Sequence, residues 1–164
     1  MIISVIGSGN AEPDIYALAE DVGKALGKRG VTVVCGGMGG VMEAVCKGAK
    51  ATGGNTIGIL PGDNPNQSNK WVDYPICTGL KYARNVIVVK SGRSVIAIGG
   101  AFGTLSEIGH ALAENIPTIG LRTWIMSRNG VEDKSIQVAT DPVDAVDKAI
   151  NAARRRNLMD VMSP

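Results

Sequence analysis

Three clusters of glycine, each placed directly after a short apolar run, constrain the fold of this chain more than any other feature. The clusters lie at 7–9, 36–40 and 99–103. Glycine makes up 22 of the 164 residues, which is roughly twice its usual share of ~7%. Glycine clustered at strand ends permits tight turns and a close approach of the backbone to a ligand. We therefore expect three loops that build one site.

Apolar strands alternate with helical segments along the whole chain. Strands are predicted at 2–6, 31–35, 56–60, 94–98, 117–121 and 135–139. Helices are predicted from 13 to a stop at Gly30 and at 41–51, 79–90, 104–114 and 142–156, while 61–75 and 124–134 are expected to be connections. Such alternation is typical of a mostly parallel sheet with helices on both faces. The sequence therefore predicts a single Rossmann-like, doubly wound α/β domain over residues 1–164, with its ligand at the carboxyl ends of the strands.

Composition argues against several classes of protein. A net charge of +2 and six aromatic residues do not favour a nucleic-acid partner. Every apolar run is too short to span a bilayer, so no membrane partner is expected. The start of the chain lacks the pattern of a signal peptide, which predicts a cytoplasmic location. Three cysteines without CxxC spacing and a single histidine, His110, make a metal site improbable.

The first glycine cluster begins like a dinucleotide-binding fingerprint. The segment Gly7-Ser8-Gly9-Asn10-Ala11-Glu12 has Glu12 where the third glycine of G-x-G-x-x-G belongs. A carboxylate at that position repels a pyrophosphate, so a bound nicotinamide cofactor is not expected. The loop is either a plain strand-to-helix turn or a contact with another ligand, and the residues leave both open.

The third cluster suits a phosphate. Gly99-Gly100-Ala101-Phe102-Gly103-Thr104-Leu105-Ser106-Glu107 follows a strand and opens a helix. The free N–H groups and the dipole of a helix N-terminus bind an anion without needing a lysine. The alternative is that Thr104-x-x-Glu107 forms a capping box, in which Glu107 only satisfies a backbone N–H.

Taken with Arg84 and Gly36-Gly37-Met38-Gly39-Gly40-Val41-Met42-Glu43-Ala44, this motif resembles the Lonely Guy (LOG) superfamily, once grouped as possible lysine decarboxylases. That superfamily includes cytokinin-riboside monophosphate phosphoribohydrolases and molybdenum-cofactor carrier proteins, and is more distantly related to DNA-processing protein A. The enzymes carry P-G-G-x-G-T-x-x-E and an upstream Arg-Lys pair. Gly99, Ala101 and Asn85 depart from that pattern. The chain is therefore most similar to the carrier-protein and uncharacterised DNA-processing-protein-A-related branch.

The resemblance implies a ligand pocket with a catalytic pair. Arg84 and Glu107 are the implied catalytic residues: Glu107 would stabilise a cationic sugar or activate water, and Arg84 would anchor a phosphate or contact the leaving base. The residues expected to bind the phosphate or nucleotide are Gly7, Ser8, Gly9, Gly36, Gly37, Gly39, Gly40, Gly99, Gly100, Ala101, Phe102, Gly103 and Thr104.

Two functions follow from the resemblance. One is hydrolysis of a nucleoside 5′-monophosphate to its base and ribose 5-phosphate, which the retained Arg84 and Glu107 favour. The other is non-catalytic carriage of a phosphorylated heterocycle, such as a nucleotide or the pterin-type molybdenum cofactor, which Gly99, Ala101 and Asn85 favour. Neither requires a resident cofactor. The resemblance and the apolar character of 79–90 and 104–114 also predict a homodimer or higher homo-oligomer.

Overall fold

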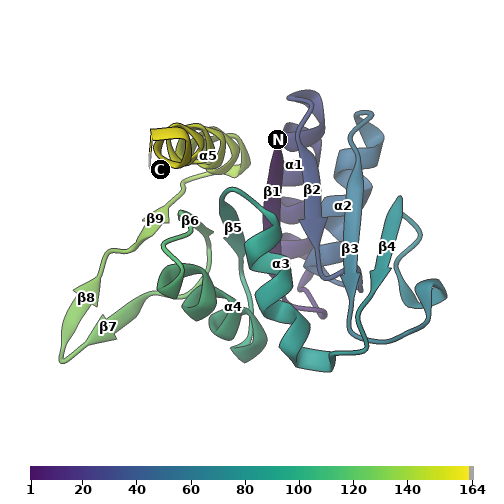
Figure 1. Ribbon diagram of the computed structural model, residues 1–164, viewed down its shortest axis with the longest axis horizontal. Coiled ribbons are helices and arrows are strands. Elements are labelled where there is room, and N and C mark those ends of the chain that lie inside the picture. The colour runs from purple at the N-terminus through teal and green to yellow at the C-terminus, as the bar shows by residue number, and fades with distance from the viewer. Residues whose placement is uncertain (163–164) are drawn as a thin grey trace.

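A computed structural model describes residues 1–162, which form a parallel sheet of seven strands in the order β4-β3-β2-β1-β5-β6-β9 (Figure 1). Each neighbouring pair in the sheet runs parallel. In chain order the elements are β1 (Ile2–Gly7), α1 (Pro13–Lys28), β2 (Thr32–Cys35), α2 (Val41–Ala51), β3 (Thr56–Leu60), η1 (Pro65–Gln67), β4 (Tyr74–Cys77), η2 (Lys81–Arg84), α3 (Asn85–Ser91), β5 (Val95–Ile98), α4 (Phe102–Ala113), β6 (Thr118–Leu121), β7 (Met126–Arg128), β8 (Val131–Asp133), β9 (Ile136–Val138) and α5 (Pro142–Met162).

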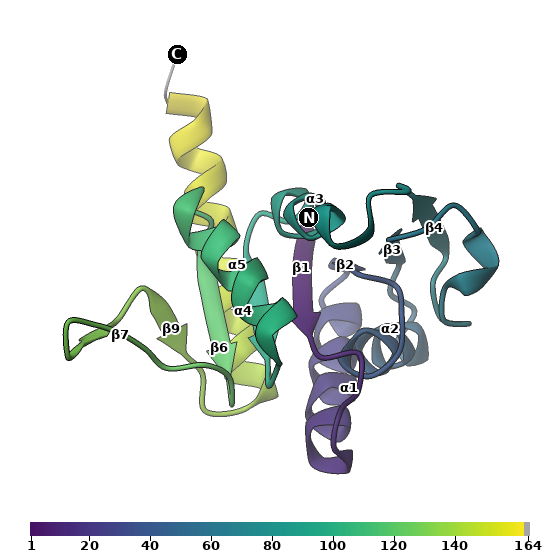
Figure 2. The same ribbon diagram turned by 90° about the horizontal axis from the view of Figure 1, so that it is seen from below.

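Helices cover both faces of the sheet, and each face has its own apolar core. Residues of α1, α2 and α5 share one core with Val5 and Ile98. Residues of α3 and α4 share the other with Ile6 and Ala97. Because successive side chains of a strand point to opposite faces, neighbouring residues of β1 and of β5 contribute to different cores. Figure 2 shows α1 and α2 on the opposite side of the sheet from α3. The predicted doubly wound α/β fold is confirmed.

The order of the strands reverses beside β1. The chain leaves β1 through α1 to reach β2 on one side, whereas β5 pairs with the other side of β1 and leads through α4 to β6. The register sets Gly7 opposite Ile98, so the loops after β1 and β5 begin side by side. Doubly wound sheets bind their ligands at the carboxyl edge of such a switch point.

Element bounds agree with the sequence where apolar periodicity is strong and differ where it is weak. The predicted α2 and β3 occupy the residues expected of them. The region 79–90 forms η2 followed by α3 rather than one α-helix from Gly79. Lys81, the first residue of η2, adopts a positive φ of 50°, so the residues before it do not continue the helix. The expected connections hold further structure: β4 begins within 61–75, and the antiparallel pair β7–β8 lies within 124–134 and projects from the body in Figure 1.

Helix α4 begins earlier than predicted. It starts at Phe102 with Ala101 as its N-cap, and the amide of Leu105 donates to the carbonyl of Ala101. Thr104 is therefore inside the first turn, and no side chain caps the helix. The capping-box alternative for Thr104 and Glu107 is wrong. The turn at Gly100, with φ of 110°, lets the helix begin two residues before the predicted start at Thr104.

Helix α5 closes the sheet on the α1 side. The hydroxyl of Ser94 donates to the carbonyl of Ala149, and Arg29, which follows α1, pairs with Asp147 across 2.6 Å. Within residues 1–162 no helix, α5 included, combines the length and the apolar character needed to cross a bilayer.

Candidate functional site

A pocket of about 580 Å³ opens at the carboxyl edge of the sheet, at the switch between β1 and β5. It is lined by Gly7, Ser8, Gly9, Met38, Met42, Pro61, Lys81, Tyr82, Arg84, Asn85, Ala101, Gly103, Thr104 and Glu107. Its walls therefore come from the loops that follow β1, β2, β3 and β5, together with η2, the starts of α2 and α3, and the first two turns of α4.

The expected site residues separate into two groups. Those that line the pocket are Gly7, Ser8, Gly9, Arg84, Ala101, Gly103, Thr104 and Glu107. Those that do not are Gly36, Gly37, Gly39, Gly40, Gly99, Gly100 and Phe102. Members of the second group shape the loops: Gly37, Gly40, Gly99 and Gly100 all adopt positive φ values. Phe102 points away as an exposed side chain that packs on Trp124, with ring centroids 5.7 Å apart.

Arg84 and Glu107 meet in the floor of the pocket. Nη1 of Arg84 lies 3.7 Å from Oε1 of Glu107, and the two residues are only 8% and 6% exposed. They come from η2 and from the second turn of α4, which the fold brings together over the end of β2. Two buried charged residues facing a pocket are unusual, because burial without full pairing is unfavourable. Such groups mark candidate functional sites.

The environment of Glu107 favours its protonated form. Burial raises the pKa of this carboxyl group to about 7, and the nearby positive charge of Arg84 offsets only part of that rise. Burial likewise lowers the pKa of Arg84 below its ordinary value, with Glu107 opposing the change. A carboxyl group that titrates near neutrality can both give and accept a proton at physiological pH.

Gly36 packs directly against the guanidinium group of Arg84. Nη2 of Arg84 donates to the carbonyl of Gly36 across 3.3 Å, and Nη1 donates to the side-chain oxygen of Asn85 across 2.8 Å. A Cβ atom on Gly36 would lie 2.5 Å from Nη2, so a larger residue would displace the arginine. Nε of Arg84 is buried with no hydrogen-bond partner among the described residues. It is an unused donor at the pocket.

The backbones of the loops after β1 and β2 are in close contact. The amide of Val41 donates to the carbonyl of Ser8 across 3.0 Å. Gly40 adopts φ of 61°, and a Cβ atom there would collide with the backbone of Ser8 and Gly9. Only glycine satisfies both conditions. The wall formed by 7–9 therefore depends on the loop 36–40, although the latter contributes only Met38 to the lining.

The N-terminus of α4 faces the pocket without a cap. Ala101, Gly103 and Thr104 all line the cavity, and no side chain bonds to the N-terminal amides. The first N–H groups of a helix have no acceptor within the helix, and they lie at the positive end of its dipole. This arrangement suits a phosphate group. Among the side chains of residues 1–158, no three from His, Cys, Asp or Glu gather as a metal site would require.

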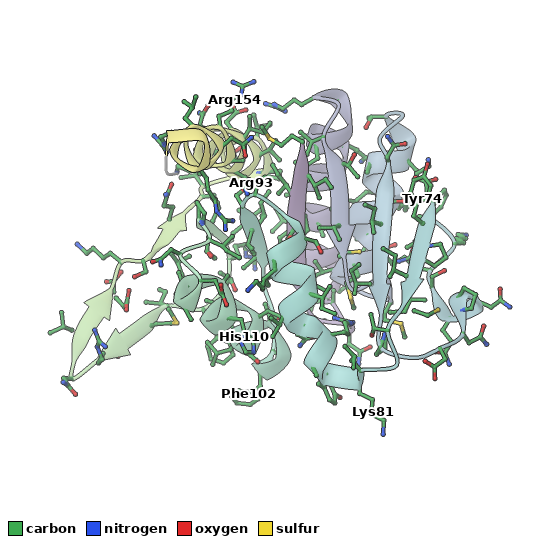
Figure 3. All side chains as sticks on the ribbon, viewed as in Figure 1. Tyr74, Lys81, Arg93, Phe102, His110 and Arg154 are labelled. Carbon is green, nitrogen blue, oxygen red and sulfur yellow. The ribbon has the colours of Figure 1, made fainter. Side chains whose placement is uncertain are left out.

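Sequence reasoning missed the opposite wall and the mouth of the pocket. Met38 and Met42 add apolar surface from the β2–α2 region, while Lys81 and the 86% exposed Tyr82 stand at the entrance. Figure 3 shows Lys81 and Phe102 at the same end of the molecule. The methionines belong to the glycine-rich segment that carries the family resemblance, which is the signal that could have identified them. No such signal marks Lys81 and Tyr82.

The comparisons with known proteins agree with this architecture. Residues 1–150 match the model of the SLOG cluster4 family. The chain belongs to this family. An uncharacterized protein of Archaeoglobus fulgidus is 37% identical over 153 residues, which cover 93% of this chain and 97% of that protein. The resemblance to the Lonely Guy superfamily is confirmed by a further relative, the cytokinin riboside 5′-monophosphate phosphoribohydrolase of Mycobacterium marinum, 32% identical over 79% of this chain. This SLOG cluster4 chain matches only 64% of that enzyme's length.

Solved structures extend the likeness over nearly the whole SLOG cluster4 chain. The molybdenum cofactor binding protein of Rippkaea orientalis superposes with a TM-score of 0.79 at 32% identity, covering 99% of this chain and 97% of that one. DNA processing protein A of Streptococcus pneumoniae superposes with a TM-score of 0.68 at 20% identity, covering 88% of this chain and 60% of that one. This second likeness is one of fold alone. The pocket therefore lies in a fold shared with a molybdenum cofactor binding protein.

Proposed function

We propose that the protein acts in the cytoplasm as a phosphoribohydrolase, which releases the base and ribose 5-phosphate from a nucleoside 5′-monophosphate. One observation carries this proposal: the buried pair of Arg84 and Glu107 faces a pocket beside an uncapped helix N-terminus. The Mycobacterium marinum relative, whose name states this activity for a cytokinin riboside 5′-monophosphate, supports it. The volume of about 580 Å³ falls within the usual range for a small-molecule site.

The proposed arrangement of the substrate follows from the polarity of the walls. The 5′-phosphate binds the free N–H groups of α4, next to Gly103 and the hydroxyl of Thr104. Glu107 lies one helical turn further along, at the level of the ribose. The base lies toward Met38 and Met42, whose apolar side chains form the opposite wall. Thioethers pack well on flat heterocycles without selecting one hydrogen-bonding pattern.

Glu107 supplies the chemistry in this proposal. Cleavage of an N-glycosidic bond passes through an oxocarbenium-like ribose, which a carboxylate stabilises. Water attacks the anomeric carbon, the C–N bond breaks, its electron pair goes to the base, and a proton from the water ends on the base. With a pKa of about 7, Glu107 accepts a proton from the attacking water and returns one to the leaving base.

Arg84 holds the carboxylate and offers one further donor. Its hydrogen bonds to Gly36 and Asn85 orient the guanidinium group, which sets Glu107 at 3.7 Å. The buried Nε atom has no hydrogen-bond partner within the described residues, so a ligand oxygen or a ring nitrogen of the base accepts its hydrogen bond. No resident cofactor enters this proposal.

The test is incubation of the full chain with AMP, followed by chromatographic detection of adenine and ribose 5-phosphate. Glu107→Gln keeps the size of the side chain but removes its charge, and we expect it to lower the rate by about 100-fold or more while AMP still binds. Glu114→Gln is the matched control, since Glu114 follows the same helix and pairs with Lys90 at the surface. Equal base release by the wild type and Glu107→Gln would remove Glu107 from the mechanism.

A second function is favoured by a separate observation. Nη1 of Arg84 already donates to Asn85, which replaces the lysine of the enzymes, and the Rippkaea orientalis protein resembles this chain over almost its full length. Both support a carrier for a phosphorylated heterocycle, either a nucleotide or a pterin-type cofactor. AMP binding measured by calorimetry without any release of adenine would favour the carrier over the enzyme.

We also propose that the protein forms a homodimer. Leu80, Tyr82, Ile87 and Phe102 expose apolar surface on η2, α3 and the start of α4, next to the mouth of the pocket. Exposed apolar surface of this kind is typical of a protein interface. Sedimentation at micromolar concentration should therefore give about twice the chain mass of 17.0 kDa, and a single species at 17.0 kDa would contradict the prediction. The expected absence of a nucleic-acid partner stays a prediction.

A further inference from the structure

Two buried cysteines lie in contact directly below the pocket. Sγ of Cys35, at the end of β2, is 3.5 Å from Sγ of Cys46 in α2, and both residues are fully buried. The backbone oxygen of Met42, a residue that lines the pocket, lies 3.8 Å from the same sulfur of Cys35. The remaining cysteine, Cys77, is exposed on β4, which β3 separates from β2.

The surroundings distinguish the two thiols. The amide of Gly37 donates to Sγ of Cys35 across 3.3 Å, and either thiol can donate across the contact between Cys35 and Cys46. These hydrogen bonds and the positive charge of Arg84 lower the pKa of Cys35 against the opposing effect of burial, whereas the pKa of Cys46 is raised. Cys35 is therefore the more nucleophilic sulfur of the pair.

We propose that Cys35 and Cys46 form a reversible disulfide when the protein meets a peroxide, and that this bond loosens the loop 36–40 beneath the pocket. The sulfurs need to approach by only about 1.5 Å to reach the S–S bond length of about 2.05 Å. Neither the bond nor its effect on the loop depends on the ligand or on the activity proposed above.

The chemistry balances with hydrogen peroxide as the oxidant. The thiolate of Cys35 attacks one peroxide oxygen, the O–O bond breaks and a sulfenic acid forms, while the departing hydroxide takes up the proton that the Cys35 thiol had released and becomes water. The thiol of Cys46 then attacks the sulfenic sulfur, the S–S bond forms, and a second water leaves with the thiol proton. Two thiols and one peroxide thus give one disulfide and two waters, and a dithiol such as dithiothreitol reverses the change.

Formation of the disulfide affects the pocket through the backbone next to Cys35. Movement of its sulfur toward Cys46 removes the acceptor of the Gly37 amide. The preceding residue, Gly36, holds Arg84 through its carbonyl and lies flat beneath the guanidinium group. A shift of this peptide releases one of the hydrogen bonds that keep Arg84 beside Glu107. Oxidation therefore disturbs the floor of the pocket rather than its mouth.

The first measurement counts thiols in the full chain carrying Cys77→Ser. The protein is treated with hydrogen peroxide, denatured and labelled with N-ethylmaleimide before mass spectrometry. We expect two labels before oxidation and none after it, a mass lower by two hydrogen atoms, and full recovery with dithiothreitol. The control, Cys46→Ala with Cys77→Ser, should retain oxygen on Cys35 instead. Unchanged labelling, or added oxygen without loss of hydrogen in the Cys77→Ser protein, would overturn the proposal.

The second measurement follows the amide of Gly37 by hydrogen exchange. In the Cys77→Ser protein, exchange in the segment 36–38 should accelerate by about tenfold on oxidation and recover on reduction, because the amide loses its sulfur acceptor. The Cys46→Ala control should show no such change. A disulfide that forms without faster exchange in this segment would refute the link to the pocket. Failure of AMP binding in the reduced protein would instead count against the proposed function alone.

Discussion

The two ends of the sheet each carry a pocket and an arginine–carboxylate pair, in opposite surroundings. At the carboxyl end, Arg84 and Glu107 are buried at 3.7 Å beside about 580 Å³ of space. At the amino end, Arg29 and Asp147 are partly exposed at 2.6 Å beside about 450 Å³. Figure 3 shows Arg154, which lines this second pocket, at the opposite end from Phe102.

The shorter contact is not the more significant one. An exposed pair keeps most of its hydration, so its close geometry contributes little to the free energy of folding. The buried pair loses hydration and is only partly compensated, as the raised pKa of Glu107 indicates. Buried groups with perturbed pKa values cluster at functional sites. Burial and incomplete pairing therefore indicate the candidate site better than distance does, and four predictions test this contrast.

The largest effect is expected from two glycines with positive φ, one at each end. Gly40→Ala should lower the free energy of unfolding by at least about 3 kcal/mol, because the new Cβ collides with the backbone of Ser8 and Gly9. Gly30→Ala should lower it by about 1 kcal/mol, since only the backbone conformation is unfavourable there. Chemical denaturation of both variants measures the difference. Equal losses would mean that the two glycine loops do not interlock.

The next effect is a pH dependence centred on Glu107. Its folded-state pKa of about 7 exceeds the ordinary value of 4.5, so the native state holds a proton that the unfolded state has lost between these values. Stability should therefore fall as pH rises from about 4.5 to 7, by up to about 3 kcal/mol. Glu107→Gln should remove this decline, whereas Asp147→Asn should leave it in place. Denaturation midpoints across this pH range provide the measurement.

A smaller effect is expected at Gly36. Gly36→Ala places a Cβ atom 2.5 Å from Nη2 of Arg84 and 2.6 Å from Sδ of Met42, both of them ends of flexible side chains. The chain should remain folded while Arg84 moves, and AMP affinity should fall by about tenfold, or about 1.4 kcal/mol. Calorimetric titration with AMP measures this change, and a circular dichroism melt serves as the control for folding. Unchanged affinity would separate Arg84 from ligand binding.

The smallest effect is expected at the amino end. Asp147→Asn breaks the 2.6 Å contact with Arg29, yet it should lower the free energy of unfolding by less than about 1 kcal/mol. Added salt should weaken even this difference, because exposed charges are screened. Thermal melts at low and high ionic strength provide the measurement. A loss as large as that for Gly40→Ala would contradict the contrast between the two ends.

The fold was predictable because its central strands are short apolar runs closed by glycine. The same pattern failed at the periphery. Strand β4 is exposed along its whole length, and the hairpin β7–β8 is largely polar, so neither carries the alternation that burial imposes. These elements are defined by pairing with neighbours, which local sequence does not encode. The β7–β8 register, for example, sets Arg128 opposite Val131.

The site was predictable in part, through its glycine motifs. Arg84 and Glu107 line the pocket as expected, but Phe102 does not, because the early start of α4 rotates its side chain onto Trp124. Tyr82 was missed since an exposed tyrosine has no distinguishing sequence context. The contact between Cys35 and Cys46 was likewise invisible, because it depends on how α2 packs on β2.

The position of β1 has a consequence for how the protein is made. This first strand lies between β2, which follows it closely in the chain, and β5, which begins only at Val95. A nascent chain that has left the ribosome as far as β3 can pair β1 on one side only, and it lacks both Arg84 and Glu107. Pairings of such long sequence separation form late. A ligand that needs this pocket can therefore bind only chains whose synthesis has passed α4, and its binding stabilises the folded chain over partly made ones.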